Sequence, residues 1–210
     1  MPGQEARAPL QDNVPGSGSG SGECGGARAG IGETDAIVRF ELSDDSHLRL
    51  LAEADADELY GVIERNRAYL AEWLPWAAGQ TREGTLEFIR KTGRQLELND
   101  GFQGVLVSGG QIAGAGGFLS VNWEARATRL GYWLAEARQG RGLMTSAVSA
   151  LIDHAFDEWE LNRVEIQAAT GNRRSRAIPE RLGFQQEGVL REYERVGERY
   201  LDIVVYSLLA

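Results

Sequence analysis

With 210 residues, of which 42% are hydrophobic and 25% charged, the chain has room for one well-buried domain and not for two large ones. The net charge of −9 argues against a nonspecific nucleic-acid binder, and the absence of a long apolar run argues against a membrane span or a signal peptide, so we expect a cytoplasmic protein. A single cysteine, Cys24, and two distant histidines, His47 and His154, leave no intrachain disulfide, no cysteine-based metal site and little basis for a metal-dependent or Ser-His-Asp mechanism.

Residues 1–36 differ in composition from the rest of the chain. They contain a glycine-serine run over 15–22 and few large apolar side chains, so burial cannot offset the entropy of ordering them. We therefore expect a disordered Gly/Ser-rich tail over 1–36, followed by one domain over 37–210.

The first half of this domain alternates between helical and strand patterns. In chain order we expect a strand over 47–52, a helix over 55–69 capped by Asp55 or Asp57, a helix over 82–98, a hairpin of strands over 102–107 and 112–119, and a strand over 128–134. The segment Trp73–Trp76 follows the first helix, and its proline restricts the residue before it.

The second half begins with rows of apolar residues at a spacing of four. It predicts a helix over 142–159, an alternating strand over 163–169, a short helix over 173–182 stopped by Gly183, and strands over 184–194 and 200–208. The order βααβββαβαββ indicates an α/β domain with a mixed, mostly antiparallel sheet flanked by helices.

The segment 139–145, Gln-Gly-Arg-Gly-Leu-Met-Thr, lies between a predicted strand and a predicted helix. Its glycines let the backbone approach a ligand, and the free N–H groups and dipole of the helix start favour an anion such as a diphosphate. Arg138 and Arg141 add positive charge. A tight connection without a ligand is the alternative, and the spacing fits neither a dinucleotide fingerprint nor a Walker loop.

Two motifs in this half carry a family resemblance. Gln139-x-x-Gly142-x-Met144 resembles the acetyl-CoA diphosphate motif of the GNAT superfamily, with Met144 in place of a small final residue, and Asn172–Phe184 is similar to that family's second cofactor motif. Within the family, the chain resembles the RimL-type subgroup of ribosomal-protein-serine N-acetyltransferases, on the segments 130–134, 139–145, 200–208 and 73–76. The resemblance covers about residues 40–210 and implies the GNAT fold, with acetyl-CoA as co-substrate and no metal.

The resemblance also assigns roles residue by residue. It implies a general base at Glu194, a proton donor for the CoA thiolate at Ser175, and backbone N–H groups near Leu134 that polarise the thioester carbonyl. It implies an acceptor site formed by Trp73, Trp76 and Tyr132. The residues implied to bind acetyl-CoA are Trp133, Leu134, Gln139, Gly140, Arg141, Gly142, Leu143, Met144, Thr145, Asn172, Arg174 and Ser175.

Each of these roles has a simpler alternative. Ser175 stands in the first turn of a helix, where serine often caps, and Glu194 lies in a charged strand end where most side chains are solvated. Glu192 is the nearest rival as base, because strand alternation would put it on the face of Glu194. The two tryptophans could pack the loop without touching an acceptor, and we expect His154 to be structural.

The identity of the acceptor amine is the feature that the sequence constrains least. A peptide α-amine, with a pKa near 8, is more often neutral at pH 7 than a lysine amine, with a pKa near 10.4, so a protein N-terminus is the easier nucleophile. An acetyltransferase for small amines such as antibiotics, polyamines or amino acids, and an acetyl-CoA sensor without turnover, are the alternatives. We expect no nucleic-acid or membrane partner, and the RimL-type resemblance implies a homodimer.

Overall fold

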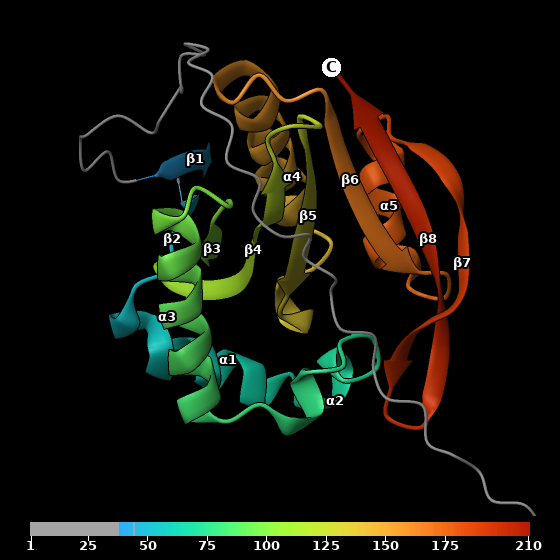
Figure 1. Cartoon of the computed structure of the whole chain (residues 1–210). Coiled ribbons are helices and arrows are strands. Elements are labelled where there is room, and N and C mark those ends of the chain that lie inside the picture. The colour runs from blue at the N-terminus through green and yellow to red at the C-terminus, as the bar shows by residue number, and fades with distance from the viewer. Residues whose placement is uncertain (1–37, 44) are drawn as a thin grey trace, which may run out of the picture.

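The computed structural model describes residues 38–43 and 45–210, so the tail expected over 1–36 lies outside the described residues. These residues form an eight-stranded sheet in the order β1-β2-β3-β4-β5-β6-β8-β7, with helices on both faces (Figure 1). Neighbouring strands are antiparallel except β5 and β6, which are parallel. The expected mixed, mostly antiparallel sheet flanked by helices is confirmed.

The bounds of the elements agree with most of the expected ones. The strands are β1 (Arg39–Ser43), β2 (Ser46–Leu50), β3 (Gln103–Ser108), β4 (Gln111–Asn122), β5 (Ala127–Leu134), β6 (Arg163–Ala169), β7 (Gln185–Val196) and β8 (Arg199–Leu209). The α-helices are α1 (Ala56–Arg65), α2 (Arg67–Leu70), α3 (Arg82–Glu97), α4 (Leu143–Asp153) and α5 (Arg173–Arg181). Short 3-10 turns are η1 (Glu53–Asp55), η2 (Ala77–Gly79) and η3 (Glu136–Arg138), and the π-helical segment η4 (His154–Glu158) continues α4.

Three local features differ from the expectation. The edge strand β1 was not expected, although its five residues alternate between exposed polar side chains and the apolar Phe40 and Leu42, which pack against the core. The helix expected over 55–69 is divided at Asn66 into α1 and α2. Asp55 stands at the N-cap of α1 as expected, but its side chain does not bond to that helix: the carboxylate accepts from the Ala52 N–H at 2.8 Å and pairs with Arg49, while Asp57, in the first turn, pairs with Arg82.

Two apolar clusters lie on opposite faces of the sheet. Helix α4 packs Val148 and Leu151 against one face, where they meet Phe118 and Val164. Helices α1 and α3 cover β3 and β4 on the other face. His154 packs its ring against Phe118 and neighbouring aromatic rings, where burial lowers its pKa, so the expected structural role fits its position.

Strands β5 and β6 separate partway along their length. Their parallel pairing runs from Ala127↔Arg163 to Leu130↔Ile166 and stops, although β5 continues to Leu134 and β6 to Ala169. Side chains and backbone groups beyond Leu130 therefore face an opening inside the sheet. Of the described residues, no helix combines the length and apolar character that crossing a bilayer requires.

Candidate active site

A cavity of about 870 Å³ occupies the opening between β5 and β6. Its walls come from α2 and the loop after it, the end of β5, the start of α4, the end of β6, α5 and the β7–β8 hairpin. Fourteen of the residues expected in the site line it: Trp73, Tyr132, Trp133, Leu134, Gln139, Gly140, Gly142, Leu143, Met144, Thr145, Asn172, Arg174, Ser175 and Glu194. Trp76 and Arg141 lie outside its lining.

The start of α4 forms one end of the cavity. Gly140 and Gly142 both have φ of 76°, a left-handed conformation that other residues adopt only with strain. The Ser146 N–H donates to the Gly142 oxygen at 3.0 Å, so the N–H groups of the three preceding helical residues have no partner within the helix. This end therefore has the backbone donors and the positive dipole end of an anion site.

Side chains of α5 add positive charge beside this loop. Arg174 donates to Gln139 Oε1, and Gln139 Nε2 donates to the Tyr69 hydroxyl at 2.5 Å. Arg181 donates to Thr145 Oγ1 at 2.8 Å. The two arginines are the only Lys or Arg side chains among the described cavity-lining residues, so the side-chain positive charge of the cavity lies at the loop end, where one exposed carboxylate, Glu136, also belongs to the lining.

The first turn of α5 borders the middle of the cavity. Asn172 caps this helix by accepting from the Ser175 N–H at 3.1 Å, so the cap is Asn172 and not Ser175. The Tyr132 hydroxyl donates to the Ser175 carbonyl at 3.0 Å, and burial raises the pKa of Tyr132 to about 12. The hydroxyl of Tyr132 is thus committed to α5, whereas Ser175 faces the cavity with its side chain free of the capping role.

The end of β5 presents a backbone donor to the opening. The Ala135 N–H donates to the Ala113 oxygen at 2.8 Å, on the side of β4. Successive N–H groups of a strand point to opposite edges, so the Leu134 N–H points toward β6, beyond the last β5–β6 pair.

Glu194 supplies a carboxylate at the other end of the cavity. It is half-buried on β7, and burial raises its pKa while the charge of Arg129 opposes that shift. The rival Glu192 lies in a bulge where the β7–β8 register shifts, with φ of 49° and its N–H donating to Asp202 at 2.8 Å. The bulge breaks the alternation from which a shared face was expected, and Glu192 is exposed outside the cavity lining.

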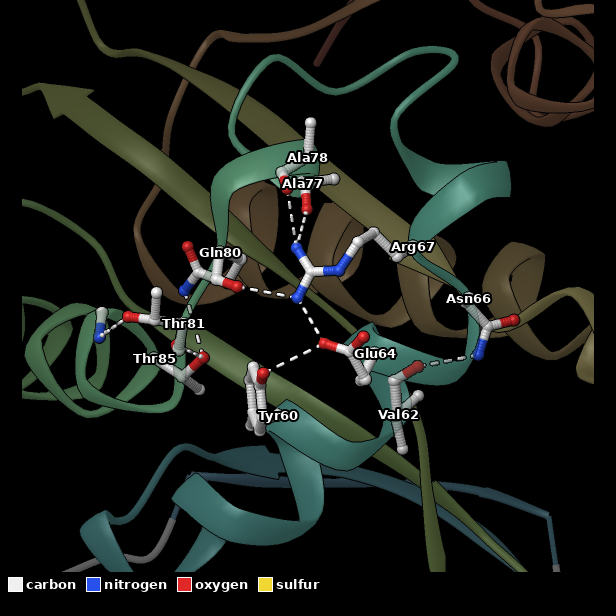
Figure 2. A network of polar contacts seen from close by, with 11 residues as sticks. Tyr60, Val62, Glu64, Asn66, Arg67, Ala77, Ala78, Gln80, Thr81 and Thr85 are labelled. Carbon is white, nitrogen blue, oxygen red and sulfur yellow. Dashed lines mark hydrogen bonds and ion pairs between the residues drawn. The ribbon is translucent and has the colours of Figure 1, made fainter.

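The loop that carries Trp73 is fixed from both ends. Figure 2 shows the Arg67 guanidinium bonded to the carbonyls of Ala77, Ala78 and Gln80, at 2.7, 2.9 and 2.8 Å. At the other end, Arg199 of the β7–β8 hairpin donates to the Glu72 oxygen at 3.1 Å. The Trp73 indole therefore forms a wall of the cavity on a loop whose backbone is anchored at both ends.

Comparison with known proteins identifies the domain. The family model described as "Acetyltransferase (GNAT) domain" matches residues 46–185, about two thirds of the chain. The chain belongs to the GNAT acetyltransferase family. The expected GNAT fold and acetyltransferase activity are therefore confirmed.

Individual members of the GNAT family resemble the chain over most of its length. The putative ribosomal N-acetyltransferase YdaF of Bacillus subtilis (strain 168) is 38% identical over 171 residues, covering 80% of this chain and 93% of that protein. The ribosomal-protein-serine acetyltransferase of Escherichia coli (strain K12) is 27% identical over 169 residues, covering 80% and 94%. The structure of the microcin C7 self-immunity acetyltransferase MccE, in complex with acetyl-CoA and AMP, matches with a TM-score of 0.77 and 26% identity, covering 80% of this chain and 94% of that one.

Several residues of this GNAT site had no assigned role from the sequence. Arg181 had a usable signal, because Arg174, Ile178 and Arg181 follow helical spacing within the second motif and all three line the cavity. Tyr69 and Gln167 had none, since they come from segments whose approach to the cavity depends on tertiary packing.

Proposed function

We propose that this enzyme transfers the acetyl group of acetyl-CoA to a primary amine, in the first place the α-amine of a protein N-terminus. The observation that carries the proposal is the polarity of the cavity: backbone donors and two arginines at one end, a half-buried carboxylate at the other. An anionic co-substrate and an amine fit these two ends. The names of two curated relatives refer to the ribosome or to a ribosomal protein, which supports a protein as the acceptor.

The residues at the loop end suit a CoA diphosphate. The N–H groups at the start of α4 would donate hydrogen bonds to the phosphate oxygens, with Arg174 and Arg181 offsetting the phosphate charge. The opening between β5 and β6 would take the pantetheine arm, beside Asn172. The Leu134 N–H would polarise the thioester carbonyl, and one such donor typically contributes about 3 kcal/mol in the transition state.

Two side chains would move protons in the transfer. Glu194, with a pKa raised by burial, is suited to take a proton from the amine, directly or through a water. As the neutral amine nitrogen forms its bond to the acetyl carbon and gives its proton to Glu194, the carbon–sulfur bond breaks and Ser175 gives a proton to the departing thiolate. Ser175 then regains a proton, through water, from the Glu194 carboxyl. A CoA thiolate, with a thiol pKa of about 8.5, is a good leaving group that needs little acid assistance, so a hydroxyl that hydrogen-bonds to the sulfur as it departs would suffice.

A thiol-release assay tests the proposal. Purified protein, acetyl-CoA and a panel of peptides with free or blocked N-termini should release CoA only with free α-amines, and mass spectrometry should find the acetyl group on the terminal nitrogen. If calorimetry detects no binding of acetyl-CoA, the proposal is wrong.

A small-molecule amine is the second candidate. MccE, whose structure is in complex with acetyl-CoA and AMP, is named for self-immunity to a microcin. The same assay with aminoacyl nucleotides, polyamines and free amino acids separates the two candidates. Turnover of these compounds with no turnover of peptides would favour the second.

A further inference from the structure

Helix α2 lies beside the connection between β5 and α4, and two hydrogen bonds join them. The Glu136 backbone N–H donates to Asn66 Oδ1 at 2.9 Å, and Gln139 Nε2 donates to the Tyr69 hydroxyl at 2.5 Å. The partners are three residues apart on both segments. The bonded residues therefore have the same spacing on the two segments. Helix α2 supports the residues just before the loop that contains Gly140 and Gly142, called the glycine loop below.

The contacts fix the orientation of the Gln139 carboxamide. Arg174 bonds to its oxygen, and a guanidinium has only donors, so the amide oxygen must face Arg174 and the NH₂ must face Tyr69. Gln139, Tyr69 and Arg174 all line the cavity. One side chain thus links α2, the glycine loop and α5 across the loop end of the cavity.

Helix α2 is itself a rigid support. Arg67 binds three carbonyls of the following loop and also pairs with Glu64 of α1, while Asn66 Nδ2 donates to the Val62 oxygen at 2.8 Å (Figure 2). Tyr69 follows these anchors by two and three residues. Its hydroxyl is therefore presented from a fixed backbone and not from a loose turn.

We propose that Tyr69 is a positioning residue of the acetyl-CoA site: it holds Gln139 so that the glycine loop and Arg174 are preformed for the diphosphate. The inference rests on the proposed function. Gly140 and Gly142 give the loop conformational freedom, so a loop without this support loses more entropy when it binds an anion. Without Tyr69, the enzyme should lose affinity for the phosphate end of acetyl-CoA and not for its acetyl end.

The test is Tyr69→Phe, with Tyr60→Phe as the matched control. Tyr60 is also half-buried and its hydroxyl also makes one hydrogen bond, to Glu64 at 3.0 Å, but it lies outside the cavity lining. Acetyl-CoA and acetyl-pantetheine, which lacks the phosphates of the nucleotide part, serve as the two donors. Tyr69→Phe should raise KM for acetyl-CoA about tenfold, the size of one lost hydrogen bond, while kcat and KM for acetyl-pantetheine stay within twofold. Tyr60→Phe should leave all of these unchanged.

A Gln139→Leu background adds an independent check. There, Tyr69→Phe should have no further effect, because the side chain that it holds is gone. Additive losses in the double variant, equal losses for both donors, or a Tyr69→Phe enzyme identical to Tyr60→Phe would overturn the inference while leaving the proposed function standing. A wild-type protein that does not bind acetyl-CoA overturns both.

Discussion

Leu130 of β5 pairs with Ile166 of β6, and beyond this pair the two parallel strands separate. Both side chains are buried in the core, so the point of separation is fixed by packing on one face of the sheet. The opening that follows is bordered by the Leu134 N–H on one strand and by Gln167 on the other. The fold thereby creates the cavity with main-chain geometry, and in the proposed mechanism the side chains of Glu194 and Ser175 move the protons.

Replacing Glu194 by Gln should lower kcat/KM for a peptide amine by a factor of about 10² to 10⁴, the usual contribution of a general base. Glutamine keeps the shape of the side chain, so the affinity for acetyl-CoA measured by calorimetry should not change. Glu192→Gln is the matched control, since Glu192 is two residues away and exposed outside the cavity lining. Equal losses in the two variants would mean that charge on this strand, and not proton transfer at Glu194, matters.

The acid limb of the pH profile should depend on Arg129. Burial raises the pKa of Glu194 and the positive charge of Arg129 lowers it, so loss of that charge should raise the pKa further. Because the base works only when deprotonated, Arg129→Gln should move the acid limb of kcat/KM to higher pH, and Arg129→Lys should leave it near the wild-type position. Titration of the amine itself is the same for all three enzymes. A limb that moves to lower pH in Arg129→Gln contradicts the assignment.

Trp73 and Trp76 should differ in their effect on the acceptor. Trp73 lines the cavity and stands against Gly171, where an added Cβ would lie 3.4 Å from the indole. Trp76 is 39% exposed and makes an edge contact with Trp133 at 6.2 Å between ring centroids. Trp73→Ala should raise the acceptor KM about tenfold or more and leave acetyl-CoA binding intact, with a smaller effect from Trp76→Ala. The reverse order would move the acceptor site to the outer face of the loop.

The sequence predicted most of the fold because its signals are local. The apolar rows of α4, the alternation of β6 and the glycine that ends α5 each act within a few residues, and each element was found. Strand β1 was missed because its alternation, with Phe40 and Leu42 as the apolar residues, spans only five residues. The break at Asn66 was missed because its side chain is held by Glu136, 70 residues away.

The sequence predicted those site residues that belong to its recognisable motifs. Gln139 and Gly142 lie in the cavity lining where the resemblance puts them, because both belong to one continuous loop. Tyr69 could not be found, since nothing in its neighbourhood indicates that it meets Gln139. Glu192 was weighed against Glu194 on strand alternation, and only the bulge, a feature of pairing with β8, separates the two.

The ion pair of Glu187 and Arg163 should stabilise the fold in a pH-dependent way. The Glu187 carboxylate accepts from the Arg163 guanidinium at 2.7 and 2.6 Å and from the Ser207 hydroxyl at 2.7 Å, which lowers its pKa from 4.5 to about 2. A carboxylate with a lowered folded-state pKa contributes stability that is fully present above pH 4.5 and is lost as the pH falls to about 2. Glu187→Gln removes this contribution. The Tm of the wild type should therefore exceed that of the variant near neutral pH, and the two should converge as the pH falls from 4.5 toward 2.

Glu198→Gln provides the control for this comparison. Glu198 pairs with Arg195 at 3.5 Å, but its side chain is 95% exposed, and exposed pairs contribute little. Its melting curve should follow that of the wild type at every pH, so a change common to both variants would reflect net charge. If the difference between wild type and Glu187→Gln stays constant down to pH 2, the ionised form of Glu187 is not what stabilises the β6–β8–β7 edge.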